Sequence, residues 1–197
     1  MEISNYKVKV FEKEIGYVNN PRYKVSIEKL IELLPDYFFE VPASSTGKYH
    51  PSFALGNRGL VRHTKVAVRV AKELFNDDSI SGGYTHNEKD LMIMALIMHD
   101  GLKSGLIKSE YTSFDHPLLV SKYIRENRDK TELKDNELEF LCKVIESHMG
   151  PWNTNSYSNV TLPVPETRYQ RFVHMCDYLA SRKFLDVKFD KDDNIID

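Results

Sequence analysis

The segment Leu91-Met-Ile-Met-Ala-Leu-Ile-Met-His99-Asp100 decides the fold, because it is an apolar run that ends in a histidine and an aspartate. A buried carboxylate is costly unless it is paired or binds a metal. The neighbouring imidazole adds a nitrogen ligand to an oxygen ligand, a combination that suits divalent transition metals. Taken alone, the pair is equally consistent with a helix that surfaces at His99 and is capped before Gly101. The rest of the chain decides between a metal site and a capped helix end.

Length and composition predict one globular domain. The chain has 197 residues, of which 41% are hydrophobic and 28% charged, and its net charge is -2. This charge gives no electrostatic basis for binding duplex DNA or an anionic membrane. Cys142 and Cys176 lie far apart, which predicts reduced thiols rather than a disulfide framework or a zinc site. Because no signal-peptide core and no membrane-length apolar run are present, we expect a cytoplasmic protein.

Helical periodicity dominates the sequence. It predicts a short helix over residues 26–34, with Ser26 as N-cap and Pro35 as stop, and five longer helices over residues 60–75, 87–98, 116–125, 134–148 and 166–179. Residues 1–25 are expected to form an irregular or β lead-in, and the tail is expected to form one hairpin. The predicted fold class is therefore all-α, a single helical bundle. Its expected divisions are a lead-in with a substrate loop (1–54), a helical domain (55–182) and a tail (183–197).

Polar residues lie on the apolar faces of these helices. Six of them occupy core-facing positions: His63, His99, Asp100, His116, His148 and Asp177. Any one of them alone is more often a hydrogen-bonded core residue or a helix cap than a ligand. Neutral packing would require a separate partner for each side chain, whereas a metal centre satisfies them all at once. The set as a whole therefore favours a metal centre built from facing helices.

With these residues in place, the sequence resembles the HD-domain superfamily of metal-dependent phosphohydrolases over residues 55–182. The residues that carry the resemblance, in the family's order, are His63, the His99-Asp100 pair and Asp177. Two further histidines and a lysine match the branch that binds two metals, namely His116, His148 and Lys103. The segment Gly59-Leu-Val-Arg-His63 is also similar to bacterial and phage members that carry a Lys-Tyr-His-Pro segment upstream. Asp177-Tyr-Leu-Ala-Ser-Arg182 shows the same similarity.

Two departures from known relatives narrow the substrates that this resemblance implies. Cyclic-di-GMP phosphodiesterases of the superfamily carry a Gly-Tyr-Pro signature after the histidine pair, whereas His148 is followed here by Met-Gly-Pro-Trp152. The HD-type exoribonucleases carry an N-terminal OB-fold, and the residues that precede the Lys-Tyr-His-Pro segment are too few for one. We therefore expect neither cyclic-di-GMP hydrolysis nor processive RNA degradation.

The resemblance implies a ligand set and a mechanism. It implies that the first metal is held by His63, His99, Asp100 and Asp177, and that Asp100 bridges to a second metal held by His116 and His148. A water held between two such ions would attack phosphorus, and Lys103 would stabilise charge on the phosphoryl oxygens. Mn, Fe, Co, Ni and Zn ions all suit these ligands. If His116 and His148 serve instead as acid or base beside the substrate, the enzyme uses one metal.

Several side chains near this set are candidates for substrate contacts: Lys48, Tyr49, His50, Arg62, Trp152 and Arg182. The polar loop 42–51 offers hydroxyls and a cation suited to a phosphate, although it lacks P-loop spacing and a plain solvated loop explains it equally well. Trp152 suits base stacking, although a lone tryptophan in a loop is as often a packing anchor. His174, one turn before Asp177, is a candidate to orient a metal ligand.

The predicted function is hydrolysis of a phosphoester, more specifically a phosphodiester, in a nucleotide, cyclic nucleotide or short oligonucleotide. Asp100 and Lys103 are the expected catalytic residues, and two divalent transition metal ions are the expected cofactors. A single-metal nucleoside mono- or triphosphate hydrolase and a non-catalytic nucleotide-binding protein are the alternatives. The oligomeric state stays open.

Overall fold

The computed structural model describes residues 3–44 and 46–196, and over these residues the chain is helical and forms no sheet. The expected all-α fold class is therefore confirmed. The α-helices in this part of the chain are α1 (Ile3–Val10), α2 (Glu12–Ile15), α3 (Pro21–Glu32), α4 (Gly59–Phe75), α5 (Asp78–Ser81), α6 (His86–Met98), α7 (His116–Glu126), α8 (Asp135–Glu146) and α9 (Arg168–Ala180). Short 3-10 helices occupy Asp36–Phe39, Ser52–Ala54 and Arg128–Lys130. Across these same residues, no helix combines the length and the apolarity that crossing a membrane requires.

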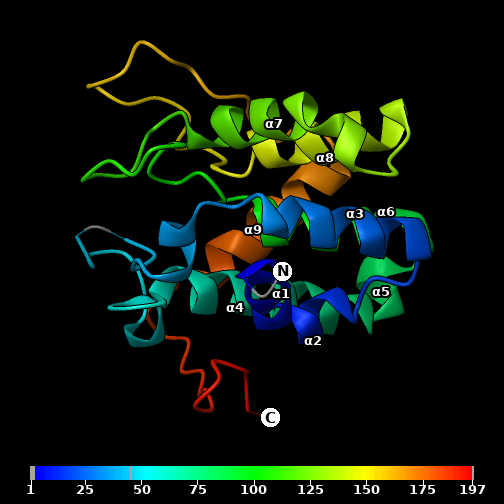
Figure 1. Ribbon diagram of the computed structural model, residues 1–197, viewed down its shortest axis with the longest axis horizontal. Helices are drawn as coiled ribbons and strands as arrows, with labels where there is room; N and C mark the ends of the chain where they lie inside the picture. Colours follow the sequence, from blue (N-terminus) through cyan, green and yellow to red (C-terminus); the bar gives the residue numbers. More distant parts are fainter. Residues whose placement is uncertain (1–2, 45, 197) are drawn as a thin grey trace.

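Helix α6 runs through the middle of the bundle and carries the His99-Asp100 pair at its end (Figure 1). All of its residues from Leu91 to Met98 are buried, which is typical of a helix with no solvent face. Helices α3, α4, α8 and α9 pack against it, and α7 packs on α8. A capping box starts the helix, in which Thr85 and Glu88 each accept the other's backbone N–H. The apolar run thus carries His99 and Asp100 into the interior.

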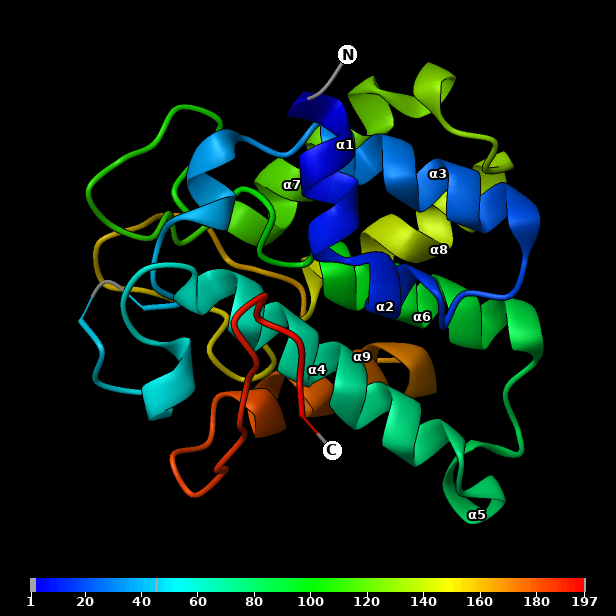
Figure 2. The same ribbon diagram turned by 60° about the horizontal axis from the view of Figure 1, so that its bottom comes forward.

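The long loops gather at one end of the bundle, on the left of Figures 1 and 2. They are the loop between α3 and α4, the loop between α6 and α7, and the loop between α8 and α9. Since α6 ends there, α7 begins there and α8 ends there, the polar residues at these helix ends meet beneath the loops. This end of the molecule positions the candidate site.

The N-terminal region is helical, so the expected irregular or β lead-in is wrong. The buried residues Phe11, Ile15 and Val18 follow a helical spacing, whereas the alternation of Val8 and Val10 that suggested a strand is local. Helices as short as α1 and α2 are stabilised mainly by packing rather than by their own propensity. Here α1 packs on α3, and α2 on α3 and α4.

Helix α3 begins five residues earlier than the periodicity predicts. Asn20 is its N-cap and accepts the N–H of Arg22, and Pro21 occupies the first helical position. Ser26, the expected cap, lies inside the helix, where its hydroxyl donates to the carbonyl oxygen of Arg22. The helix ends at Glu32, before Pro35 as expected.

The C-terminal tail, residues 184–196, returns along α4 (Figure 2). The expected hairpin is reduced to a single antiparallel bridge between Phe189 and Ile195. In its turn, Asp193 adopts a left-handed φ of 60° and forms ion pairs with Arg58 and Arg62. The tail is therefore fastened to the start of α4.

Candidate metal centre

Asp100 lies between two groups of histidines. Its Oδ1 is 3.0 Å from His116 Nε2 and 3.7 Å from His148 Nε2. Its Oδ2 is 3.4 Å from His99 Nε2 and 3.9 Å from His63 Nε2. The two oxygens of one carboxylate thus face two different pairs of imidazoles, which come from helices far apart in the sequence.

Two groups form around Asp100. The first group is His63, His99 and Asp177, and the second group is His116 and His148. On the first side, Asp177 Oδ1 is 2.9 Å from His63 Nε2 and 3.4 Å from His99 Nε2. On the second side, the Nε2 atoms of His116 and His148 are 3.2 Å apart. All of these side chains are buried except Asp177, which is partly exposed. The structure therefore brings together all six residues that the sequence singled out. Among them, His63, His99 and Asp177 form one group that could hold a metal ion, and His99, Asp100 and His148 form another.

Three of the histidines are oriented by hydrogen bonds of one kind. In each, Nδ1 donates to the carbonyl oxygen three residues earlier, at 2.7 to 2.8 Å: His99 to Leu96, His116 to Ser113 and His148 to Ile145. Because a carbonyl oxygen only accepts, Nδ1 carries the proton and Nε2 of the neutral ring presents its lone pair. Hydrogen bonds of this kind fix the tautomer and orientation of metal-binding histidines. Three Nε2 atoms are thereby aimed at Asp100.

The cluster fits a cation, because its acceptor atoms face one another. His99 Nε2 is buried without a hydrogen-bond partner among the described residues and lies near oxygens of both Asp100 and Asp177. The Nε2 atoms of His116 and His148 likewise point at each other. Lone pairs and carboxylate oxygens at such distances repel unless a positive charge lies between them. Either shared protons or metal ions meet that need, and imidazole with carboxylate is a donor set suited to divalent transition metals.

The pKa values of His99 and Asp100 also show that this part of the site favours positive charge. Burial by itself lowers the pKa of His99, but the charges of Asp100 and Asp177 outweigh it and raise this pKa to about 10. Burial also opposes ionisation of Asp100, but Lys103 and His99 hold its pKa well below the ordinary range. The two aspartates therefore stay ionised and stabilise a cation beside them.

In the second group, the pKa of His148 is shifted in the opposite direction to that of His99. Burial, and then the positive charges of His99 and His116, lower the pKa of His148 to about 3. The ring is therefore neutral at physiological pH, which is the state in which imidazole binds a metal.

Lys103 lies beside the cluster, in the turn that follows α6. Its Nζ is 2.5 Å from Asp100 Oδ2. The turn is held by Tyr37, whose hydroxyl accepts from the N–H of Ser104 at 3.1 Å and donates to the carbonyl oxygen of Gly105 at 2.6 Å. Burial raises the pKa of Tyr37 to about 12, so the hydroxyl stays neutral and keeps both roles. Sequence analysis missed Tyr37 because this contact joins residues from two distant segments.

The loop between α3 and α4 brings one of its three candidates to the cluster. The ring of His50 meets the ring of His63 edge-on, with centroids 5.0 Å apart, and its Nδ1 is buried without a partner among the described residues. Burial, reinforced by His63, lowers the pKa of His50 to about 3, so this ring is also neutral. Lys48 and Tyr49 are instead exposed, and the Lys48 ammonium lies 5.3 Å from the Tyr49 ring centroid.

Arg62 does not extend toward the cluster. Its guanidinium donates to Asp193 and to three carbonyl oxygens of the preceding loop, those of Phe53, Leu55 and Asn57. Through these bonds Arg62 holds the loop and the tail against α4. The guanidinium thus has a structural role instead of the phosphate contact that was expected of it. No local pattern in the sequence indicates the Asp193 partner, which lies 131 residues away.

Trp152 and Arg182 both lie on the ring of Tyr178. The indole stacks on it with centroids 5.6 Å apart and planes inclined by 14°, and the Arg182 guanidinium carbon is 4.0 Å from the ring centroid. His174, expected to orient a ligand, donates from Nδ1 to the carbonyl oxygen of His148 at 2.7 Å. Tyr178 is a second residue that the sequence analysis missed, although it directly follows Asp177.

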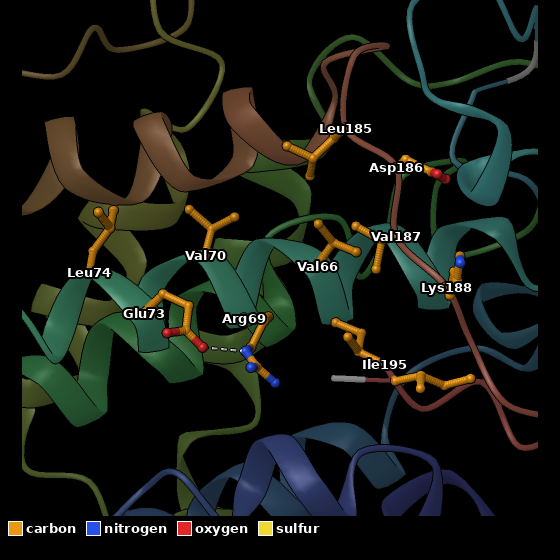
Figure 3. Close-up of a pocket in the computed structure, with 11 residues that line it drawn as sticks. Val66, Arg69, Val70, Glu73, Leu74, Leu185, Asp186, Val187, Lys188 and Ile195 are labelled. Carbon is orange, nitrogen blue, oxygen red and sulfur yellow. Dashed lines mark hydrogen bonds and ion pairs between the residues drawn. The ribbon is translucent and has the colours of Figure 1, made fainter.

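A groove of about 800 Å³ lies apart from this cluster, between α4 and the tail (Figure 3). Its walls are mainly apolar, with Val66, Val70 and Leu74 on α4 facing Leu185 and Val187 on the tail. None of the six predicted ligands lines it.

Comparisons of the chain with protein-family models, with curated proteins and with solved structures find no match. The chemistry of the cluster must therefore be read from its own side chains.

Proposed function

We propose that this protein is a metal-dependent phosphohydrolase of the HD superfamily, which cleaves a phosphoester bond, preferably a phosphodiester, in a nucleotide, cyclic nucleotide or short oligonucleotide. The observation that carries this proposal is the placement of two histidine pairs on the two oxygens of Asp100. A bridging carboxylate suits two ions about 3.5–4 Å apart, which is the spacing found in many phosphodiester-cleaving sites. The order of the ligands along the chain also supports the superfamily.

In this proposal, His63, His99, Asp100 and Asp177 would hold one divalent ion, and Asp100, His116 and His148 would hold a second. Divalent ions bound there would supply a water of lowered pKa and neutralise negative charge around phosphorus. Mn, Fe, Co, Ni and Zn ions all suit such a set of ligands.

The remaining side chains bind the substrate and keep the site in order. The Lys103 ammonium neighbours Asp100, so it can donate to a phosphoryl oxygen of a substrate bound beside it. Tyr37 keeps the Lys103 turn in place through its two hydrogen bonds. Burial of the ligand side chains excludes bulk water, which strengthens every electrostatic interaction among them.

The proposal is tested by hydrolysis of bis-p-nitrophenyl phosphate, a diester, and p-nitrophenyl phosphate, a monoester, in the presence of Mn²⁺. We expect diester cleavage by the wild-type protein and a loss of about 10³-fold or more in Asp100→Asn, which keeps the shape of the side chain but not its charge. Asp90→Asn is the matched control, because Asp90 is also buried on α6 but accepts from the backbone N–H groups of Asn19 and Asn20, which precede α3. Diester cleavage that survives in Asp100→Asn would contradict the proposal.

A single-metal nucleoside mono- or triphosphate hydrolase is the second candidate. It is favoured by the 3.2 Å contact between the Nε2 atoms of His116 and His148, which suits two rings that share a proton and act as acid and base. The first site would then work alone, with monoesters or triphosphates as substrates. The two candidates differ in the number of ions bound per chain.

A further inference from the structure

Trp152 is the only tryptophan of the chain, and it is 52% exposed. The ring is nonetheless in contact with the rings of Tyr178 and His174, and the Arg182 guanidinium lies on the Tyr178 ring; we call these four side chains the aromatic stack. The Trp152 and Tyr178 planes are inclined by only 14°, and the His174 ring centroid is 6.1 Å from that of Trp152. An exposed ring with a firm backing is prepared to receive another flat ring with little loss of conformational entropy.

Two links join the aromatic stack to the candidate metal centre. Tyr178 directly follows the predicted ligand Asp177 on α9. His174 donates to the carbonyl oxygen of His148, the predicted ligand at the end of α8. The stack therefore adjoins the candidate metal centre, where the turn after α8 meets α9.

The turn from His148 to Trp152 fixes the distance between them. Gly150 has a φ of 62°, and a Cβ at this position would lie 2.2 Å from the ring of His174. Gly150 N–H donates to Ser147, and Trp152 N–H donates to Met149. Glycine is required because both the left-handed backbone and the close approach of His174 exclude a side chain.

The exposed part of Trp152 does not anchor its loop. Anchoring is provided by Leu162, which is 2% exposed and whose N–H donates to the carbonyl oxygen of Asn153 at 2.8 Å. A tryptophan that served only to hold the loop would be buried in the same way, whereas half of this one stays accessible. Its exposed surface is thus free for a ligand.

We propose that the exposed part of Trp152 is a nucleobase-binding subsite, which stacks the base of a substrate whose phosphate lies at the metal centre. This inference rests on the proposed function and specifies how that site selects its substrate. Every base has a flat π face, so stacking on an aromatic ring tolerates any base. The subsite therefore favours nucleotides over sugar phosphates and does not discriminate among bases.

Trp152 fluorescence tests this subsite directly, because no other tryptophan contributes to the signal. The purified protein is titrated with AMP and, separately, with ribose 5-phosphate, which lacks only the base. We expect saturable quenching by AMP and none by ribose 5-phosphate. Tyr178→Ala removes the backing of the ring and should weaken AMP binding about tenfold. Tyr157→Ala, which removes a 97% exposed ring from the same loop, should leave it unchanged.

Absence of quenching by AMP, or equal quenching by both compounds, would overturn the subsite. Should Tyr178→Ala fail to fold, the comparison of the two compounds on the wild-type protein decides alone. The titration needs no turnover, so its outcome is separate from that of the hydrolysis assay. In kinetic terms, Trp152→Ala should raise KM for a dinucleotide with little change in kcat, and Trp152→Phe should restore it.

Discussion

His99 and Asp100 illustrate how burial decides the role of a side chain. A pair that merely capped the end of α6 would be exposed, whereas these two side chains are 0% and 2% exposed. His99 donates from Nδ1 to the helix itself, so its Nε2 is left facing carboxylates. The pair therefore does not surface at the end of α6, and its two residues belong to buried groups that could hold a cation.

Glu137 is a buried carboxylate that has a structural role, because its side-chain hydrogen-bond partners belong to another helix. It joins α8 to α3 by accepting from Arg22 and Tyr23. Burial by itself raises its pKa, but the hydrogen bonds from Arg22, the Lys134 backbone and Tyr23 together outweigh burial and lower the pKa to about 2, from an ordinary value of 4.5. Its contribution to folding is thus complete above about pH 4.5 and is lost as the pH falls toward 2.

We expect Glu137→Gln to destabilise the protein by about 1–3 kcal/mol at pH 7, because the buried Glu137 side chain no longer offers a charged acceptor to Arg22 and Tyr23. Urea unfolding at pH 7 and at about pH 3 measures this cost, which should shrink at the lower pH. Glu139→Gln is the control, since Glu139 is a more exposed partner of Arg125 on the same helix and should cost about 0–1 kcal/mol. A Glu137→Gln cost that is the same at both pH values contradicts this role.

The C-terminal tail is the element that holds the start of α4. Arg58 and Asp193 are the two non-glycine residues with positive φ in the described part of the chain, and they form an ion pair with each other. Arg62 joins Asp193 to the loop that carries His50. Strained backbone of this kind persists only where surrounding contacts impose it, so the tail and the loop stabilise each other.

We predict that Asp193→Ala destabilises the protein by about 1–3 kcal/mol, because it leaves two guanidinium groups without their carboxylate. Hydrogen exchange should also become faster at the amides of Ala54 and Arg58, which close the adjoining loop. Asp192→Ala is the matched control, since Asp192 is exposed and should cost less than about 0.5 kcal/mol. Unchanged exchange at both amides in Asp193→Ala would show that the tail does not hold the loop.

Over the whole molecule, the sequence predicts the helices that have a clear local period of hydrophobic residues. The helix expected over 60–75 is observed as Gly59–Phe75, and the one expected over 116–125 as His116–Glu126. The six core-facing polar residues were recognisable because each one interrupts an apolar stripe. Their convergence follows from packing five helices around one core.

What the sequence could not predict depends on contacts between distant segments. The short helices α1 and α2 have too few turns for a clear period and owe their stability to packing on α3 and α4. Arg62 binds Asp193, and Tyr37 binds the turn after Lys103. No local pattern reveals such partners, and so the ligands were easier to predict than the residues that position them.

The central claim is that the buried histidines and aspartates form a metal centre with two ion sites, and the metal content of the purified protein tests it most directly. Elemental analysis should find about two divalent transition metal ions per chain and about one in His148→Ala. His86→Ala is the control, because His86 is exposed at the opposite end of α6 and should leave both ions in place. Protein that binds no metal, or a His148→Ala variant that keeps the wild-type metal content, would contradict the account.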